Sequence, residues 1–246
     1  GGFVPVQFQR VLELPGIATR NLSSLQAIMC CGSPLPPPLK RATRDTLACE
    51  LIELYGLTEG IITTLAPEEF DAHIESVGKP IPGQQLKLVR DDDVEAAPGE
   101  LGEICGYGRL VMEGYHQRPD ATEEATWVDT QGGRWLRTGD IGRLDDDGFL
   151  YIVDRKKDLI IRGGFNVFPR DVEEALLEHP AIAAAGVVGR SDEAHGEEVV
   201  AFVELRSGQE ADTDDLVAFA KERIGSYKYP REVHVVPSLP LTPVGK

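Results

Sequence analysis

The stretch that decides the fold class is residues 26–59, QAIMCCGSPLPPPLKRATRDTLACELIELYGLTE. Residues 26–31 are a short apolar run that ends in a Gly-Ser-Pro turn, which predicts a strand. A helix is expected from about Pro38 to Ala48, followed by a second apolar strand from Leu51 to Tyr55. Strand, helix and strand in this order indicate a parallel α/β sheet.

After about residue 75 the pattern changes to short strands separated by turn residues. Strands are expected at 85–89, 102–106 and 149–153. Residues 144–149 carry three aspartates and a glycine, and Asp-Gly tolerates the positive φ angles of a tight turn. This part of the chain is therefore predicted to be a β subdomain that contains a hairpin.

The last third has the pattern of a small α+β domain. A helix is expected from Asp171 to His179, followed by apolar strands at 183–188 and 199–205. A second helix is predicted with Thr213 as its N-cap and Gly225 as its end.

The boundary between the two parts is expected within the charged run 154–158, which cannot be core. Residues 1–156 are then the end of an α/β domain with its short-strand β subdomain. Residues 157–246 are the small α+β domain.

Composition excludes some classes of protein. Lys and Arg number 25 against 41 Asp and Glu, and this net charge of -16 argues against a general nucleic-acid binder, although it allows a local basic pocket for one phosphorylated ligand. No run of about 18 apolar residues occurs, so no transmembrane segment is expected. The first residues lack both an initiator Met and a secretory signal, so we expect the numbering to begin inside a longer gene product.

The four cysteines also indicate a cellular location. Cys30, Cys31, Cys49 and Cys105 include no pair with the C-x-x-C spacing of a zinc or redox site. We expect them to be small, buried, reduced side chains, which is typical of a cytoplasmic protein.

Two motifs follow predicted strands and suggest a ligand site. Residues 55–59, Tyr-Gly-Leu-Thr-Glu, combine a ring, a hydroxyl and a carboxylate that could stack on a base, touch a phosphate and hold Mg²⁺. A capped turn with a packed tyrosine explains them equally well. Asp140, after Gly139, could accept hydrogen bonds from two ribose hydroxyls, and an Asx turn is the alternative that the motif alone favours.

Two further motifs are rich in glycine. Gly163 and Gly164 allow a close backbone approach to a ligand, or form a hairpin turn that leads into a helix. Lys246, next to Gly245, is either a charge delivered by a loop tip or a solvated lysine.

Several enzyme classes lack their motifs here. The five histidines have no G-x-S-x-G nucleophile near them, so a hydrolase triad is not expected. The chain contains neither G-x-x-x-x-G-K-[ST] nor a G-x-G-x-x-G that opens a helix.

The order of the motifs along the chain carries a resemblance. The motifs, in order, are Cys31–Leu35, Tyr55–Glu59, Gly99–Ile104, Met112–Tyr115, Thr138–Asp140, Asp154–Asp158, Gly163–Pro169 and Pro240–Lys246. Together they resemble the adenylate-forming superfamily of acyl- and aryl-CoA synthetases, luciferases and peptide-synthetase adenylation domains. Asp-Arg-Lys-Lys-Asp followed by Gly-Gly-Phe-Asn-Val is similar to the acyl-CoA ligases within it.

The resemblance implies a nucleotide site in the first domain. Gly32 and Ser33 would line the adenine and acyl pocket, and Tyr55 would stack on adenine. Thr58 would contact phosphate, and Glu59 would hold Mg²⁺.

It implies further roles from residue 140 onward. Asp140, helped by Arg155, would bind the ribose. Lys157 would be the hinge of a mobile small domain. Lys246 would be the lysine that catalyses adenylation, and Gly163–Gly164 would face the CoA thiol.

The implied activity is that of a cytoplasmic ATP- and Mg²⁺-dependent acyl-CoA synthetase, with a fatty acid preferred over an aryl acid as the substrate. The partners would be a small carboxylic acid, ATP and coenzyme A. The family is about twice as long as this chain and grips triphosphate with an upstream loop, so we expect a carboxy-terminal portion that is inactive by itself. An adenylation domain that loads a carrier protein and a non-catalytic binding module are the alternatives.

Overall fold

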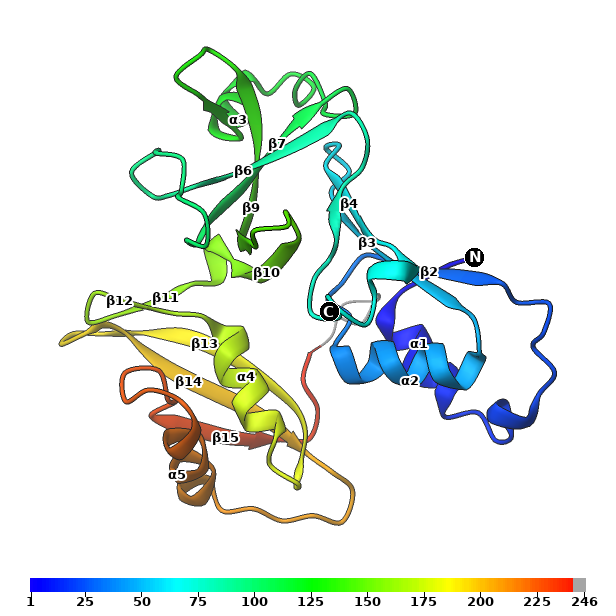
Figure 1. The fold of residues 1–246 in the computed structure, drawn as a ribbon. Helices are drawn as coiled ribbons and strands as arrows, with labels where there is room; N and C mark the ends of the chain where they lie inside the picture. The colour runs from blue at the N-terminus through cyan, green and yellow to red at the C-terminus, as the bar shows by residue number, and fades with distance from the viewer. Residues whose placement is uncertain (241–246) are drawn as a thin grey trace. The chain divides into compact units, whose positions relative to one another are not determined.

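The computed structural model describes residues 1–240, and the catalytic assignment of Lys246 lies outside them. The chain divides into two compact units, residues 1–152 and a second unit that begins at Val153 (Figure 1). The division falls inside strand β10 (Leu150–Arg155), whereas the sequence placed the boundary after residue 156.

The first unit begins with a five-stranded sheet in the order β1-β2-β3-β4-β5. Its strands are β1 (Gly2–Phe3), β2 (Ala27–Cys30), β3 (Glu50–Gly56), β4 (Ile62–Leu65) and β5 (Lys79–Pro80). Strands β1, β2 and β3 are parallel, and β4 and β5 add antiparallel pairs. The predicted parallel strand–helix–strand unit is therefore confirmed.

The helices of this sheet lie side by side (Figure 1). They are α1 (Pro5–Leu12) and α2 (Pro37–Leu47), and short 3₁₀ turns occur at Ile17–Thr19 and Pro67–Glu69. Helix α2 begins at prolines, which suit the first helical turn, and ends at Ala48 in the left-handed conformation with φ 49°. It occupies the predicted place in the chain.

The second sheet of the first unit has the order β10-β9-β7-β6, with β8 paired to β9. The additional elements are β6 (Gln84–Val89), β7 (Gly102–Gly108), α3 (Pro119–Glu124), β8 (Thr126–Val128) and β9 (Arg134–Leu144). The predicted hairpin connects β9 to β10. Asp145 accepts hydrogen bonds from the backbone N–H groups of Asp147 and Phe149, and Gly148 has φ 80°.

The second unit is a sheet in the order β12-β11-β14-β13, with β15 paired to β14. The strands are β11 (Ile160–Arg162), β12 (Phe165–Val167), β13 (Ile182–Asp192), β14 (Gly196–Leu205) and β15 (Glu232–Val236). A 3₁₀ turn at Lys156–Asp158 precedes them. The β13–β14 hairpin is longer than the sequence predicted, because paired strands continue through the charged residues near its turn.

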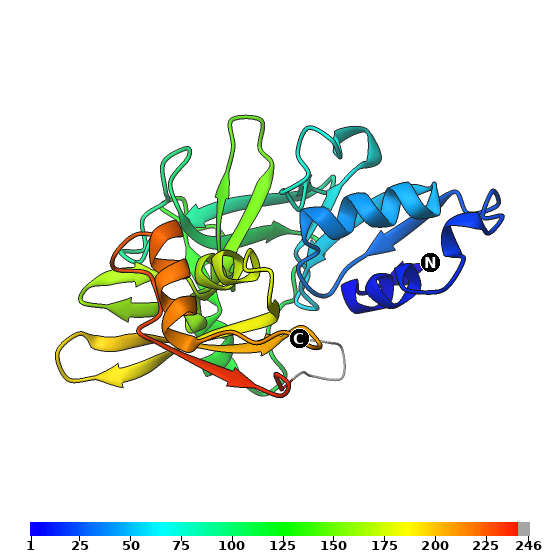
Figure 2. The ribbon, with the colours of Figure 1, turned by 90° about the horizontal axis from the view of Figure 1, so that it is seen from below.

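Helices α4 (Pro169–Leu177) and α5 (Thr213–Arg223) pack side by side against the sheet (Figure 2). The side chains predicted to face the core from α4, Val172, Ala175 and Leu176, are buried. The predicted N-cap of α5 is wrong by one residue. Asp212 caps this helix, since its carboxylate accepts hydrogen bonds from the N–H groups of Asp214 and Asp215, and a carboxylate caps more strongly than a threonine hydroxyl. The helix also ends before Gly225, at an extended Ile224.

The small strands β1, β4, β5, β8 and β15 were not predicted. Over residues 1–240, the structure contains no helix long and apolar enough to cross a membrane.

Cys30, Cys49 and Cys105 are buried, Cys31 is half-buried, and all four are free thiols. Burial, followed by the neighbouring Glu53 carboxylate, raises the pKa of the Cys30 thiol to about 12.

Candidate functional site

Tyr55 and Asp140 meet although they lie 85 residues apart in the sequence. The Tyr55 hydroxyl, at the end of β3, donates a 2.7 Å hydrogen bond to Oδ2 of Asp140 in β9. Asp140 is buried, with 7% of its surface exposed, and its backbone N–H donates to the Thr138 hydroxyl at 3.0 Å. It lies in a strand and not in the Asx turn that the sequence also allowed. Packing thus brings together an aromatic ring and a carboxylate.

Gly32 and Ser33 follow β2 and lie at the same edge of the parallel sheet as the loop after β3. Ligands gather at this edge in parallel α/β sheets. Gly32 has φ 91°, a conformation that glycine adopts without strain. Ser33 is half-buried, and Thr58 is exposed. These residues therefore belong to one edge of the first sheet.

Glu59 is held by a segment that the sequence analysis quoted without a role. Its carboxylate Oε1 accepts a 3.0 Å hydrogen bond from the Tyr115 hydroxyl, and its backbone oxygen accepts one of 2.8 Å from the N–H of Met112. Sequence reasoning missed Tyr115. Its place in the ordered motif Met112–Tyr115 was the one available signal.

The oxygen donors at this loop fit a magnesium ion. Thr58 offers a hydroxyl and Glu59 a carboxylate, and hard divalent cations prefer such ligands. Tyr115 donates to Oε1 of Glu59, and Oε2 is the oxygen that could meet a cation. The two side chains could supply part of an ion's coordination, with nucleotide phosphate and water supplying the rest.

The remaining predicted site residues that the structure describes lie in the second unit. Arg155 ends β10, and Lys157 lies in the 3₁₀ turn with 71% of its side chain exposed. Gly163 and Gly164, with φ 57° and 82°, form the turn between β11 and β12. Two positive φ angles are typical of a type I′ hairpin turn, and α4 follows directly, so the hairpin that the sequence allowed is present.

Asp154 ties the segment before Lys157 to helix α4. One carboxylate oxygen accepts from the N–H of Arg155 at 2.7 Å, and the other accepts from the N–H of Arg170 at 3.0 Å. Burial is the largest cause of the shift in the pKa of the Asp154 carboxyl, and it raises that pKa. Burial likewise raises the pKa of Glu173 in α4, and the nearby Asp154 carboxylate adds to that rise. The second unit thus holds two half-buried carboxylates close to each other.

One other cluster in residues 1–240 has metal-ligand residue types. Asp192, His195 and Glu198 place ligand atoms within 4.8 Å of one another. However, Arg162 donates to both Glu198 oxygens, at 2.5 and 3.1 Å. This cation already neutralises the carboxylate, and the cluster is explained as an ion pair beside a hairpin turn.

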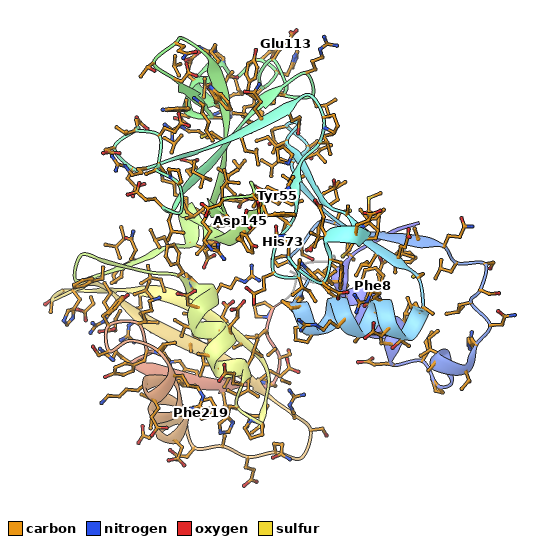
Figure 3. All side chains as sticks on the ribbon, viewed as in Figure 1. Phe8, Tyr55, His73, Glu113, Asp145 and Phe219 are labelled. Atoms are coloured by element: carbon orange, nitrogen blue, oxygen red, sulfur yellow. The ribbon has the colours of Figure 1, made fainter. Side chains whose placement is uncertain are left out.

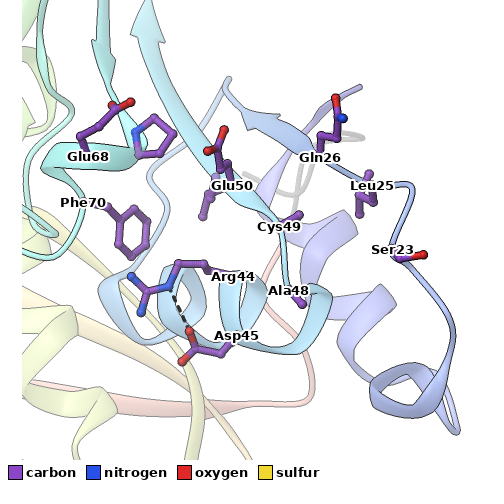
Figure 4. Close-up of a pocket in the computed structure, with 12 residues that line it drawn as sticks. Ser23, Leu25, Gln26, Arg44, Asp45, Ala48, Cys49, Glu50, Glu68 and Phe70 are labelled. Carbon is purple, nitrogen blue, oxygen red and sulfur yellow. Dashed lines mark hydrogen bonds and ion pairs between the residues drawn. The ribbon is translucent and has the colours of Figure 1, made fainter.

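A cavity of about 940 Å³ lies in the first unit, at the amino ends of β2 and β3 (Figure 4). Its walls include Gln26, Glu50 and Phe70, and Arg44 pairs with Asp45 at its rim. Tyr55 lies at the carboxyl end of β3, and Gly32 follows the carboxyl end of β2, so this cavity is separate from the candidate nucleotide site. Figure 3 labels His73 and Asp145, whose side chains approach to 3.6 Å elsewhere in this unit.

Comparisons with known proteins decide the family. Residues 2–116 match the family described as AMP-binding enzyme, and residues 171–246 match the AMP-binding enzyme C-terminal domain. This chain belongs to the AMP-binding enzymes. The resemblance to adenylate-forming enzymes and the mixed α/β and α+β fold class are therefore confirmed.

Similar curated proteins include CoA ligases with different acids in their names. A 2-succinylbenzoate–CoA ligase of Geobacillus kaustophilus is 42% identical over 96% of this chain and 47% of its own length. A medium/long-chain-fatty-acid–CoA ligase, FadD8, of Mycobacterium tuberculosis is 41% identical over 99% of this chain and 43% of its own length. The chain spans about half the length of these curated relatives.

Solved structures of two synthetases are also similar to this chain. The o-succinylbenzoate CoA synthetase of Bacillus subtilis, in complex with ATP and magnesium, has a TM-score of 0.82 at 37% identity, covering 98% of this chain and 48% of that one. The amide bond synthetase McbA of Marinactinospora thermotolerans has a TM-score of 0.87 at 34% identity, covering 99% and 50%.

Proposed function

We propose that this chain is part of an ATP-dependent acyl-CoA synthetase, an acid–thiol ligase. A carboxylate oxygen attacks the α-phosphate of ATP, which releases pyrophosphate and forms an acyl-adenylate. The thiol of coenzyme A then attacks the acyl carbon and releases AMP. The CoA ligases among the relatives support this reaction, and the cited fatty-acid ligase supports a fatty acid as the substrate. The free thiols support a reducing, cytoplasmic location.

The observation that carries the proposal is the meeting of Tyr55 with Asp140. The buried Asp140 carboxylate can accept from ribose hydroxyls, since an ionised carboxylate is an acceptor alone. The Tyr55 ring lies beside it and offers a face for adenine. Gly32 and Ser33 lie at the same edge, and we assign the adenine and acyl pocket to them.

The charged groups act on the phosphates in this proposal. Thr58 contacts phosphate, and Glu59 holds a magnesium ion that offsets the negative charge of ATP. Arg155 helps Asp140 with the ribose, and Lys246 neutralises the attacking carboxylate. Preorganised charge of this kind usually contributes more to the rate than any other single effect in an enzyme.

The second unit takes part in the transfer of the acyl group to coenzyme A. Lys157 is the proposed hinge, and the backbone at Gly163 and Gly164 faces the CoA thiol. Lys157 is exposed, which is compatible with a change of its backbone angles. A domain boundary at this hinge is part of the proposal.

Titration calorimetry with AMP tests the nucleotide site in this chain. Asp140→Asn should weaken AMP binding about tenfold, as expected when a hydrogen bond to a charged group is lost. Wild type should prefer AMP over 2′,3′-dideoxy-AMP, and the variant should bind both alike. Asp146→Asn, in the exposed turn after β9, is the matched control. Equal AMP affinity of Asp140→Asn and wild type would refute the ribose assignment.

A further inference from the structure

The loop after β3 also packs closely against the segment 109–115 at Gly60 and is hydrogen-bonded to Gln84. Gly60 has φ 114°, and a Cβ atom there would lie 1.8 Å from the backbone oxygen of Leu110. The Gln84 side chain donates to the Gly60 oxygen and accepts from the N–H of Ile62. The backbone around Glu59 is therefore held by neighbours from two other parts of the chain, the segment 109–115 and Gln84.

Tyr115, which reaches the Glu59 side chain, is itself anchored. Its N–H donates a 2.9 Å hydrogen bond to the Thr122 hydroxyl in α3, and that hydroxyl donates to the Arg118 oxygen at 2.9 Å. A Cβ at Gly114 would lie 2.9 Å from the Thr122 methyl group, so the segment approaches α3 closely. The backbone that carries the Tyr115 side chain is thus held in place by helix α3.

The geometry points to a positioning role for this tyrosine. A phenol that donates to Oε1 restricts the rotation of the carboxylate and decides which oxygen a cation can approach. Ligands of this kind are commonly oriented by hydrogen bonds from a second layer of residues, whose loss costs about 10–100-fold in metal affinity. Tyr115 is 39% exposed, so core packing does not explain the bond.

We propose that Tyr115 is a positioning residue that orients Glu59 for the magnesium ion bound with ATP. The inference rests on the proposed function, in which Glu59 holds that ion. Tyr115 touches neither nucleotide nor metal in this proposal and acts through the Glu59 carboxylate.

The test uses two cations that require different coordination geometries. Mg²⁺ requires near-ideal octahedral geometry, whereas Ca²⁺ accepts flexible coordination. Tyr115→Phe, which removes the hydroxyl and keeps the ring, should weaken Mg²⁺-dependent ATP binding about tenfold, at the low end of that range. Ca²⁺-dependent ATP binding should weaken by less than about threefold, because a looser site tolerates a rotated carboxylate. Calorimetry with ATP and each cation measures both effects.

Matched measurements separate this inference from the proposed function. AMP binding without a metal should be equal in wild type and Tyr115→Phe, and the midpoint of urea unfolding should be unchanged. Tyr107→Phe is the control for loss of an exposed phenol, since Tyr107 is 49% exposed. Thr122→Val, which loosens the anchor, should show the same selectivity for Mg²⁺ more weakly.

Three results would overturn the inference. Equal Mg²⁺-dependent ATP binding in Tyr115→Phe and wild type, with normal AMP binding, removes the role of Tyr115 and leaves the nucleotide site intact. Equal losses with Mg²⁺, with Ca²⁺ and without metal indicate a structural role for the tyrosine. Absence of AMP binding in wild type overturns the proposed function of this chain and, with it, the inference.

Discussion

The two units hold their candidate site residues in different ways. In the first unit, side chains from distant elements bind each other, as Tyr55 binds Asp140 and Tyr115 binds Glu59. In the second unit, Gly163 and Gly164 occupy an exposed hairpin turn, and the N–H of Gly163 donates to the backbone oxygen of His195. A pair of side chains from distant elements fixes the geometry of both groups, whereas a glycine turn between adjacent strands needs only a hairpin.

The two units also differ in the burial of their ion pairs. Lys40 and Glu53 form an ion pair in the core of the first unit, with 2% and 5% of their side chains exposed. The Lys40 ammonium also donates to the backbone oxygens of Ile74 and Ser76. In the second unit, Arg190 and Glu232 pair at the surface, with 53% and 41% exposed.

The largest expected effect comes from breaking the buried pair. Lys40→Met should lower the free energy of unfolding by about 3–5 kcal/mol, because it removes the ammonium group that pairs with the buried Glu53 carboxylate. Arg190→Met should cost less than about 1 kcal/mol, since solvent screens an exposed pair. Urea denaturation of both variants measures the contrast. Similar losses in the two variants would show that burial does not determine how much these ion pairs contribute to stability.

A pair of glycine substitutions tests the backbone difference. Gly60→Ala should destabilise the chain by about 2–4 kcal/mol, because left-handed strain adds to overpacking against the Leu110 oxygen. Gly164→Ala should cost about 1 kcal/mol, since its φ of 82° is strained for alanine but no atom beyond its chain neighbours lies within 4 Å of the new Cβ. Thermal unfolding compares the two. A larger loss for Gly164→Ala would contradict the close approach of Gly60 to Leu110 as the cause of the difference.

The smallest effect is a difference in pH dependence within the second unit. The pKa of Asp154 is raised by burial, so its contribution to stability is present below the ordinary value of 3.8 and is lost as pH rises through the raised pKa. Asp154→Asn should therefore gain stability relative to wild type as pH rises from about 4 to 7.

Asp192→Asn is the matched opposite case. The N–H of His195 is the main cause that lowers the pKa of Asp192, so its contribution is present above the ordinary value and is lost as pH falls through the lowered pKa. This variant should lose stability relative to wild type as pH rises from about 2 to 5. Urea titrations at several pH values measure both slopes. Slopes of the same sign would show that burial does not control the pKa of Asp154.

Local patterns predicted much of the fold. Apolar runs and turn residues predicted β2, α2 and β3, and Asp-Gly predicted the β9–β10 hairpin. The N-cap of α5 was misplaced because Asp212 and Thr213 are both good capping residues. A local pattern does not show which of the two has the extended backbone of an N-cap. Strands such as β4 and β15 were missed because they are short and are stabilised by pairing with neighbours.

By itself, the sequence determined the family, the order of the motifs and the elements whose signals lie within a few residues. The tertiary structure alone decided that Tyr55 meets Asp140 and that Tyr115 reaches Glu59. These contacts join residues 85 and 56 positions apart, and they depend on strand register and on how one sheet packs against the next. A local pattern records the periodicity of a segment but not its partner, because a partner is selected by the free energy of packing the whole unit.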